Sequence, residues 1–471
     1  MSELYARKTP YGQPVIFGML AALAGVGKLP PRRGSSPASL DIRLQNAVFA
    51  DIDYDLSLDT APDMDRARLT DGRRVLMTAS IKYRTARSGK LTTTSHVEPL
   101  STALVRETSD FAAGRAFAGK WSPDRAAFDQ LRDRWHLDGK GGDERHHAAL
   151  LLASYAVGMD LPGQQALFSQ MTLDFDPDGA LEGDEFEYRL AIAKYQPVFK
   201  LLILNVDLRL GARRFAAGEI RVFVRDATGV GDGGREDVPA GQALQGKVAC
   251  VVGGSRGLGA DIVAALARQG CRVIVNFAKS VDEAERLRND LRGAPGEVVL
   301  AQGDAGSAGT WERIREQVIA PYGRLDLLVC NACPPLLPLW VEPPAVQRIQ
   351  EHVTQSLAMA LAPLATSIEL LARSSGWLVL VSSAAVKNPV AEWPHYAAAK
   401  GALEALVTTA AVEYPKIKCL IARPSRLRTE LTNTPLGRKG ALASGAVATS
   451  LVQWLVTTRS HTAGQVEYLE F

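Results

Sequence analysis

The sequence is poor in cysteine, in excess charge and in long apolar runs, and each shortage excludes a class of protein. Five cysteines in 471 residues, an odd number, argue against a disulfide framework. A formal net charge of +3, with no block of like charges, argues against a nucleic-acid binder. The longest apolar run near the start, VIFGMLAALAGVG, holds 13 residues, too few to span a bilayer, and MSELYARKTPYGQP is a poor start for a signal peptide. We therefore expect a cytoplasmic protein that binds neither nucleic acid nor membrane.

Two of the cysteines have the spacing of a CxxC motif. Cys330 is the last residue of an apolar, strand-like run, LDLLVC, and Cys333 follows three residues later, where the chain enters a Pro-Pro loop. The sequence offers no second cysteine pair that would complete a zinc site. We interpret these cysteines as buried, unreactive thiols and expect no metal ion.

A stretch rich in glycine and acidic residues divides the chain. Residues 226–246, DATGVGDGGREDVPAGQALQG, have no apolar periodicity, which is typical of a linker, and we place the linker over 227–246. After it, apolar strand-like runs alternate with helical segments. That pattern predicts a parallel sheet covered by helices on both faces, and hence an α/β, doubly wound Rossmann domain over 247–471.

The half before the linker has a different pattern, in which an apolar helix is followed by several strand-like runs. The pattern occurs twice and predicts two α+β units of similar design, over 1–115 and 116–226. The strand-like runs of the first unit are 39–49, 54–59, 73–84 and 90–97. Residues 100–142 are polar and poorly periodic, and we assign no element there.

The first strand-like run after the linker ends in VVGGSRGLG, residues 251–259. Gly253, Gly257 and Gly259 let the backbone turn tightly and approach a pyrophosphate. The helix that follows offers free N–H groups and the positive end of its dipole to the phosphates. This loop lies between a strand and a helix, where a dinucleotide-binding loop requires its glycines.

A second motif lies downstream, in VSSAAVKNPVAEWPHYAAAK. Ser383 is followed 13 residues later by Tyr396 and, one helical turn further, by Lys400. Tyrosine and lysine at positions i and i+4 share a helix face, and a nearby ammonium lowers the pKa of a phenol. We expect Tyr396 to exchange a proton with a carbonyl oxygen that the Ser383 hydroxyl holds by a hydrogen bond.

Through these motifs, residues 246–471 resemble the short-chain dehydrogenase/reductase family, and within it the 3-oxoacyl-thioester reductases (β-ketoacyl-ACP reductases). The resemblance implies that Asp304 contacts the adenine, that Asn331 lies in the family's Asn-Asn-Ala-Gly position, and that Thr429 holds the nicotinamide amide. The cofactor site implied in this way consists of Gly253, Ser255, Arg256, Gly257, Leu258, Gly259, Lys279, Asp304, Asn331, Ala332, Tyr396, Lys400 and Thr429.

The sequence also departs from the family pattern. Ser356 stands where the family has a fourth catalytic residue, an asparagine that helps to hold a proton-relay water beside the lysine. A serine can partly replace that amide, so we place Ser356 with Ser383, Tyr396 and Lys400 among the catalytic residues. The segment after Thr429 is short, which predicts a reduced substrate lid.

Charge at the end of the second predicted strand indicates the cofactor. NAD-specific folds place an acid there to bind the ribose 2′-hydroxyl. Here the strand ends in VIVNFAKS, with Asn276 and Phe277 and no acid. Arg256 and Lys279 are near enough in the sequence to meet a 2′-phosphate. We therefore expect NADPH, which also suits reduction rather than oxidation.

The first half is similar to the MaoC-like enoyl-thioester hydratases, which have the hotdog fold. SELYARKTPYGQPVIFGMLAALAGVGKLP resembles the central helix region of those enzymes, and ASYAVGMDLPGQQALFSQMTLDF resembles it a second time. The resemblance implies a double hotdog over roughly residues 1–226 and a thioester substrate.

Dehydration by such a domain requires an acid and a histidine. Phe17 stands where the family has a histidine, and the second unit offers Asp143, His147 and His136. Asp143 and His147 resemble the acidic helix motif of polyketide dehydratases. We favour a structural interpretation, in which Asp143 suits the dipole of a polar helix start and the histidines face solvent.

Together these observations predict an NADPH-dependent ketoreductase that reduces a 3-oxoacyl thioester, carried on an acyl carrier protein, in polyketide or fatty-acid-like biosynthesis. Tyr396 protonates the forming alkoxide, Ser383 orients the carbonyl, and Lys400 lowers the tyrosine pKa and holds the ribose. Two alternatives stay open: a bifunctional reductase and dehydratase with an active hotdog domain, and a catalytically weak nucleotide-binding scaffold. We expect a homo-oligomer, either a dimer or a tetramer.

Overall fold

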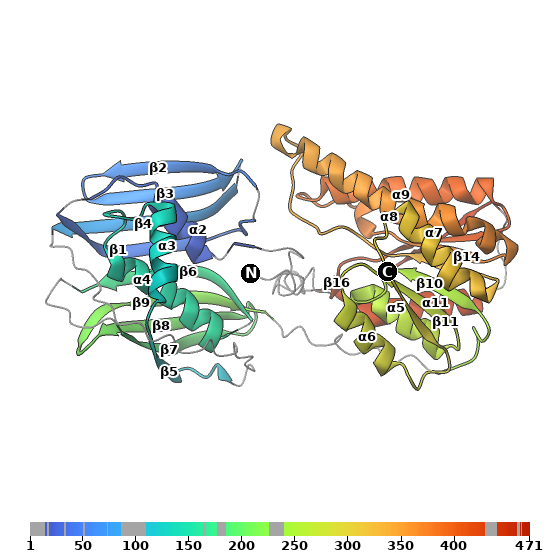
Figure 1. Cartoon of the computed structure of the whole chain (residues 1–471), viewed down its shortest axis with the longest axis horizontal. Helices are drawn as coiled ribbons and strands as arrows, with labels where there is room; N and C mark the ends of the chain where they lie inside the picture. The colour runs from blue at the N-terminus through green and yellow to red at the C-terminus, as the bar shows by residue number, and fades with distance from the viewer. Residues whose placement is uncertain are drawn as a thin grey trace. The chain divides into compact units, whose positions relative to one another are not determined.

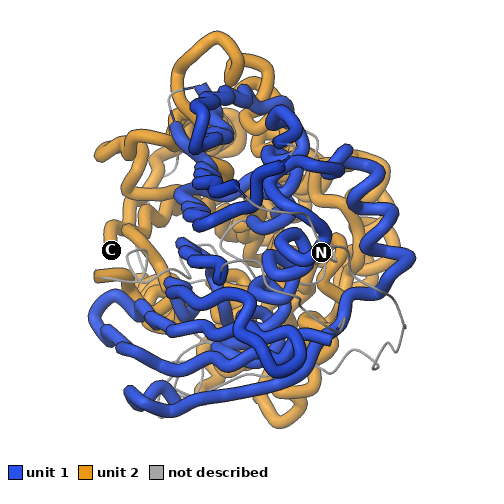
Figure 2. The backbone as a smooth tube through the Cα atoms, turned by 90° about the vertical axis from the view of Figure 1, so that its left-hand side faces the viewer, with its two compact units in different colours: residues 1–6, 13–227, 434–436 blue, residues 7–12, 228–433, 437–471 orange. Residues whose placement is uncertain are grey.

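The computed structural model describes residues 15–16, 18–32, 34–49, 52–72, 74–85, 110–163, 165–176, 185–225, 240–428, 440–458, 462 and 464–471. The described residues up to 225 belong to one compact unit and those from 240 onward to a second (Figure 2). Each unit has its own sheet and its own hydrophobic core.

Within the described residues, the first unit is built on one antiparallel sheet of nine strands, whose spatial order is β2-β3-β4-β1-β6-β9-β8-β7-β5. The strands are β1 (Ser35–Leu44), β2 (Asp55–Ala61), β3 (Met64–Asp71), β4 (Arg74–Thr85), β5 (Ala116–Trp121), β6 (Ala166–Phe175), β7 (Phe186–Gln196), β8 (Leu201–Leu210) and β9 (Arg213–Val224). The helices that pack with this sheet are α2 (Gly18–Val26), α3 (Arg125–Trp135) and α4 (Glu144–Tyr155). Figure 1 draws them between the two ends of the curved sheet.

The same arrangement occurs twice in this sheet. After α2 the strands lie in the order β1-β4-β3-β2, and after α4 they lie in the order β6-β9-β8-β7. The two sets meet where β1 pairs antiparallel with β6, with Asp41 opposite Thr172. The two halves of the sheet therefore repeat one order of helix and strands.

Several elements of this unit were absent from the sequence expectation. Strand β5 and helix α3 lie in the polar region 100–142, to which we assigned no element. Helix α3 buries Phe128 fully. Strand β3 is short and rich in charged residues, so it lacks an apolar run. The predicted strand at 90–97 and the position of Phe17 lie outside the described residues.

The described residues of the second unit form a parallel sheet of seven strands in the order β12-β11-β10-β13-β14-β15-β18, which confirms the predicted Rossmann-like fold. The strands are β10 (Val248–Val252), β11 (Arg272–Phe277), β12 (Val298–Gln302), β13 (Leu327–Cys330), β14 (Trp377–Val381), β15 (Lys418–Arg423) and β18 (Val466–Glu470). The chain order reverses between β10 and β13, so the carboxyl ends of these two strands border the crevice in which such sheets bind ligands.

Helices cover both faces of the second sheet (Figure 1). The helices of this unit include α5 (Gly257–Arg268), α6 (Val281–Asp290), α7 (Ala308–Ile314), α8 (Val346–Arg373), α9 (Pro394–Glu413) and α11 (Ser444–Thr457). Alternate strand residues face the two helical layers: Ala249 and Val251 pack with α5 and α11, whereas Cys250 and Val252 pack with α8 and α9. This alternation follows from the two-residue period of a strand.

Three cysteines lie in the apolar layer beneath α8 and α9, namely Cys250, Cys330 and Cys419. Burial raises the pKa of Cys330 and of Cys419 to about 12, and it raises the pKa of Cys250 further. These thiols are protonated at neutral pH and therefore unreactive. Cys333 is only half-buried.

Candidate active site

The loop after β10 allows a ligand to approach the backbone closely. Gly253 and Gly257 have φ of 72° and 53°, in the left-handed region that favours glycine. A Cβ atom at Gly253 would lie 2.9 Å from the Cα of Ala332, and one at Gly259 would lie 2.2 Å from the Gly253 oxygen. Side chains at these positions would fill the loop. The geometry therefore fits the predicted pyrophosphate cradle at the start of α5.

Asn331 holds this loop to the end of β13. Its side-chain Nδ2 donates a hydrogen bond of 2.9 Å to the Gly253 oxygen, and its backbone N–H lies 3.3 Å from the Val252 oxygen. Ser255 and Leu258, which complete the predicted loop, are both buried. The structure thus brings the predicted loop residues together with Asn331 and Ala332.

The end of β11 carries the residues from which we predicted the cofactor. Asn276 is buried, and its Nδ2 donates to the oxygens of Ala301 and Gly303 at 3.2 and 3.1 Å, so it holds the sheet together. Arg256 and Lys279 are both exposed, at the start of α5 and just after β11.

Asp304 lies just beyond the end of β12. Its side chain is exposed, and Oδ1 accepts the backbone N–H of Gly306 at 2.9 Å. The carboxylate therefore shapes its own turn and also remains open to solvent. Thr429, the predicted contact of the nicotinamide amide, lies outside the described residues, as does the predicted short lid that follows it.

The predicted catalytic triad comes together at the ends of β14 and α9. Ser383 follows β14, and its Oγ accepts the Ala385 N–H at 3.1 Å; the same hydroxyl is near enough to Tyr396 to lower the pKa of that phenol. The Lys400 Nζ donates to the Val381 oxygen at 2.7 Å and lies 5.7 Å from the centre of the Tyr396 ring. Hydroxyl, phenol and ammonium are therefore neighbours, as the spacing predicts.

The protonation state of Tyr396 differs from the sequence expectation. Burial raises its pKa above the ordinary value, although the Lys400 ammonium and the Ser383 hydroxyl act in the opposite direction. Lys400 therefore lowers the pKa of Tyr396, as predicted, but burial raises that pKa by more. Tyr396 keeps its proton at neutral pH, which is the state that an acid in a reduction requires.

Ser356 has a different partner from the one we expected. It is buried on α8, and its Oγ donates a 2.7 Å hydrogen bond to the backbone oxygen of His352, one turn earlier. Because this bond uses the hydroxyl proton, Ser356 cannot donate that proton toward a water beside Lys400. The serine therefore does not reproduce the asparagine amide.

A buried ion pair that the sequence analysis missed braces the triad. Glu404, one turn after Lys400 on α9, accepts from Arg423 at 2.9 and 2.6 Å and from the Ser382 hydroxyl at 2.5 Å. Burial opposes ionisation, but Arg423 and Ser382 hold the pKa of Glu404 below its ordinary value. Ser382 directly precedes Ser383, so one carboxylate links both elements of the site. The spacing of Lys400 and Glu404 on one helix face was the available signal.

In the first unit, the expectation that the histidines face solvent is wrong for two of them. His147 is buried, its Nε2 lies 2.8 Å from the Lys140 oxygen, and burial lowers its pKa to about 4. The equally buried neighbour, His146, lies 2.6 Å from Asp143 through its Nδ1. His136 is exposed at the end of α3.

Asp143 caps helix α4. Its Oδ1 accepts the backbone N–H of Arg145 at 3.0 Å, and its Oδ2 accepts from the guanidinium of the same residue at 2.6 Å. Burial opposes ionisation, but His146 and Arg145 hold the pKa of Asp143 well below its usual range. An ionised carboxylate with these partners stabilises a helix start, as the structural interpretation of this residue predicts.

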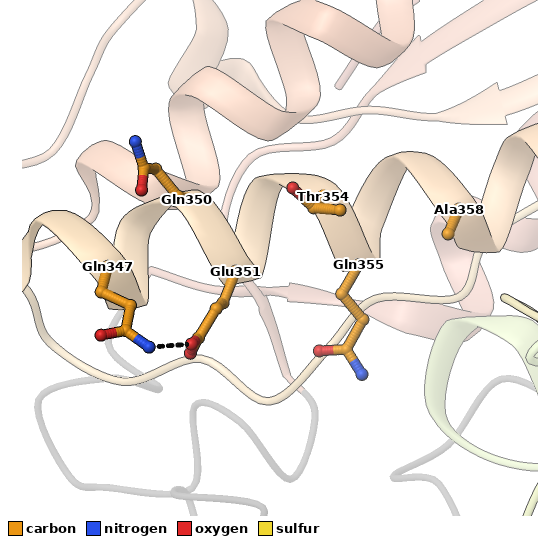
Figure 3. A pocket seen from close by; sticks show the side chains of 6 residues that line it. All are labelled: Gln347, Gln350, Glu351, Thr354, Gln355 and Ala358. Atoms are coloured by element: carbon orange, nitrogen blue, oxygen red, sulfur yellow. Dashed lines mark hydrogen bonds between the residues drawn. The ribbon is translucent and has the colours of Figure 1, made fainter.

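A surface pocket of about 440 Å³ lies on α8. Figure 3 shows its polar lining, in which Gln347 donates a 2.8 Å hydrogen bond to Glu351. The lining residues are Gln347, Gln350, Glu351, Thr354, Gln355 and Ala358. All of them belong to α8, and none of Ser383, Tyr396 and Lys400 is among them, so this pocket is separate from the triad.

The match to a known family falls within the second unit: residues 247–436 match the family model described as short chain dehydrogenase. An uncharacterized oxidoreductase of Methylorubrum extorquens is 31% identical over 213 residues, which cover 44% of this chain and 83% of that protein. A probable tetrahydroxynaphthalene reductase of Zymoseptoria tritici and a versicolorin reductase of Emericella nidulans are each 35% identical over 89 residues, 19% of this chain. Those matches span 33% and 34% of the two fungal proteins.

A solved structure of an alcohol dehydrogenase from the archaeon Thermococcus sibiricus, complexed with 5-hydroxy-NADP, is 26% identical. The match covers 48% of this chain and 95% of that one, with a TM-score of 0.44.

Proposed function

The chain belongs to the short-chain dehydrogenase family through its second unit and is an oxidoreductase that binds a nicotinamide cofactor; from this premise, we propose that it reduces a 3-oxoacyl thioester to the 3-hydroxyacyl thioester with NADPH. The observation that carries the proposal is the convergence of Ser383, Tyr396 and Lys400 beside the glycine loop. A proton donor, a hydroxyl and a cation around one point are what carbonyl reduction requires.

Each triad residue has a defined task in this reaction. The nicotinamide cofactor supplies the hydride that reaches C3 of the substrate. Ser383 donates a hydrogen bond to the carbonyl oxygen, and Tyr396, which is protonated at neutral pH, gives its proton to that oxygen as negative charge develops. Lys400 offsets the charge that is left on the phenol oxygen and donates to the ribose of the cofactor. The 3-hydroxy product leaves with one hydride and one proton added.

NADPH is preferred to NADH because of the charges near the end of β11. The described residues at that strand end include no carboxylate, and Asn276 is used within the sheet. Arg256 at the start of α5 and Lys279 just after β11 are exposed cations. Two cations favour a phosphate over a hydroxyl.

The first unit is proposed to be a double hotdog that holds the acyl chain and is not itself a competent dehydratase. Its repeated helix-and-strand arrangement supports this assignment, and a thioester-binding fold in the same chain supports a thioester substrate. Asp143 is already occupied as a helix cap. We propose further that the thioester is on an acyl carrier protein, in polyketide or fatty-acid-like biosynthesis, and that the enzyme is a cytoplasmic homo-oligomer.

The test is a direct assay of the purified full chain. 3-Oxobutanoyl-CoA and its carrier-protein thioester are incubated with NADPH or NADH, cofactor oxidation is followed, and products are identified by mass. The expected product is the 3-hydroxyacyl thioester, formed faster with NADPH. Tetrahydroxynaphthalene, the substrate in the name of one relative, serves as the competing substrate. Reduction of that compound without reduction of either thioester would overturn the proposal.

The same assay decides between the proposal and its alternatives. Formation of an enoyl thioester from the 3-hydroxy product would make the protein bifunctional. Tight NADPH binding with no reduction of any carbonyl substrate would favour the scaffold.

A further inference from the structure

Two buried histidines lie against each other between helices α8 and α9. His352 is on α8 and His395 is in the first turn of α9, and they are 7% and 1% exposed. Their ring centroids are 4.4 Å apart with the planes at 85°, an edge-to-face arrangement. The pair therefore joins the helix of Ser356 to the helix of Tyr396.

The nitrogen atoms of this pair have few partners. Within the described residues, Nε2 of His352 and both ring nitrogens of His395 are buried without a hydrogen-bond partner. Buried polar atoms are normally bonded, and leaving them unbonded is unfavourable. Two phenyl rings would fill a similar space without that cost. Packing alone thus does not account for imidazoles here.

The position of the pair ties it to the catalytic groups. His395 directly precedes Tyr396, and the backbone oxygen of His352 accepts the Ser356 hydroxyl at 2.7 Å. Burial, and then the charge of Lys400, lower the pKa of His352 to about 4. Burial, His352 and Arg348 lower the pKa of His395 to about 4. Both rings are therefore neutral at pH 7.

Building on the proposed function, we propose that the His352–His395 pair positions Tyr396 for proton transfer, and that it does so only while both rings are neutral. The groups that act on the pair are Lys400 from α9, Arg348 from α8 and the second imidazole. A proton added to either ring thus meets further cations rather than an opposite charge. The first turn of α9 then moves away from α8 so that water reaches the ring, and Tyr396 moves with it.

The direction of the pH effect follows from linkage. An imidazole in water has a pKa of about 6.5, and in the closed arrangement each ring has a pKa of about 4. Opening therefore takes up protons, and it becomes easier as the pH falls from 6.5 toward 4. At pH 5 each ring shifts the equilibrium toward the open arrangement by roughly 30-fold, compared with a pH at which both are neutral.

The first experiment measures kcat and KM for NADPH-dependent reduction of 3-oxobutanoyl-CoA from pH 8 to pH 5. The wild type is compared with the double variant His352→Phe, His395→Phe. We expect the wild-type kcat to fall at least about tenfold between pH 7.5 and pH 5, and the fall to shrink to less than about threefold in the double variant. The KM of the two proteins should follow the same pH course, because the buried pair is proposed to act on Tyr396 and not on the substrate.

The matched control is His136→Gln, which removes an exposed histidine of the first unit. It should keep the full wild-type fall. An equal acid fall in the wild type and the double Phe variant would overturn the proposal.

The second experiment needs neither substrate nor variant. Amide hydrogen exchange of the wild type is compared at pH 7.5 and pH 5, after correction for the intrinsic pH dependence of exchange. The amides of residues 397–400 should lose protection at pH 5 while those of β10 and β13 keep theirs. Unchanged protection of 397–400 would overturn the proposal even if the thioester is reduced. Loss of protection in a protein that does not reduce the thioester would support the acid-sensitive contact and count against the proposed function alone.

Discussion

Both units bury a pair of histidines at or near a helix start, but the two pairs have different surroundings. In the first unit, His146 is bonded to the Asp143 carboxylate and His147 to a backbone carbonyl. In the second unit, three of the ring nitrogens of His352 and His395 have no partner within the described residues. In the first pair, each histidine has a hydrogen-bond partner within the unit, and the pair stabilises the fold. The second leaves polar atoms unbonded beside Tyr396, in the candidate active site.

The buried ion pairs of the two units extend this contrast. Glu144 accepts from Arg125 and Arg132 at 3.0 and 2.5 Å, and all three belong to the helices of the first unit. Glu404 accepts from Arg423 and reaches the residue before Ser383. Similar chemistry therefore braces helices in one unit and an active site in the other.

The largest effect is expected when Tyr396, the proposed acid of the second unit, is replaced. Tyr396→Phe deletes one hydroxyl, and since a positioned general acid contributes about 10²- to 10⁴-fold, we expect kcat for thioester reduction to fall by that factor. NADPH binding, measured by fluorescence, should stay close to the wild-type value. Turnover within a few-fold of the wild type would remove Tyr396 from the role of acid.

Breaking the buried ion pair should cost stability as well as activity. Glu404→Gln removes the buried carboxylate partner of Arg423 and leaves that guanidinium with the exposed Glu470 alone, 3.0 Å away. We therefore expect a loss of up to about 3 kcal/mol, the cost of breaking a buried pair, to be measured by urea unfolding at pH 7. The pKa of Glu404 is lowered in the folded chain, so the stabilisation is present at neutral pH and is lost as the pH falls below about 4.5.

A matched control for this change is Glu369→Gln. That residue faces Arg373 at 3.6 Å, and both side chains are exposed. An exposed pair contributes little, so its loss should leave the urea midpoint unchanged. Equal effects of the two substitutions would show that the Glu404 pair does not brace the site.

Replacing the proposed cofactor contacts should have a smaller effect, on KM, and this effect tests the preference of the second unit for NADPH. Arg256→Ala or Lys279→Ala should raise the KM for NADPH about tenfold, since charge-assisted bonds to a phosphate are stronger than neutral ones. The KM for NADH should change less than about twofold, because NADH lacks the 2′-phosphate. Steady-state kinetics with both cofactors decides this, and equal changes would show that these side chains do not read that phosphate.

The smallest effect on activity is expected in the first unit. Asp143→Ala removes the cap of α4 and also leaves the buried Arg145 guanidinium without this carboxylate, so it should lower the free energy of unfolding by about 3 kcal/mol, with reduction of the thioester unchanged. Unfolding of the first unit and product analysis by mass check both parts. Enoyl product that forms with the wild type and disappears with this variant would instead place Asp143 in a dehydratase site.

The sequence was a better guide to the second unit than to the first for a physical reason. A parallel strand buried on both faces is an unbroken apolar run, as in VACVV, and the glycine loop and the triad depend on local spacing. The histidines of the first unit depend on distant partners: His146 packs against Phe175 and Phe215, whose rings come from strands much later in the chain. A polar helix start looks the same in a sequence whether such rings cover it or water does.

In the candidate active site, too, local spacing could be recognised in the sequence, whereas contacts between distant residues could not. Ser383, Tyr396 and Lys400 were found because two of them share a helix face and the third has a fixed spacing. Glu404 lies on α9, whereas its partner Arg423 ends strand β15, and only the packing of that helix on the sheet brings the two together.

Cys250, Cys330 and Cys419 lie in one apolar layer, so their reaction with a thiol reagent can report the opening of that layer. A thiol reagent labels these three only when the layer beneath α8 and α9 opens, so they should react together, at the rate of that opening. Cys333 is half-buried, so it should react earlier and report local breathing near the site. Cys271 is also buried, in the layer beneath α5 and α11, so the labelled cysteine is identified by peptide mass at each time. That measurement separates opening near the site from opening of the layer in the unmodified protein.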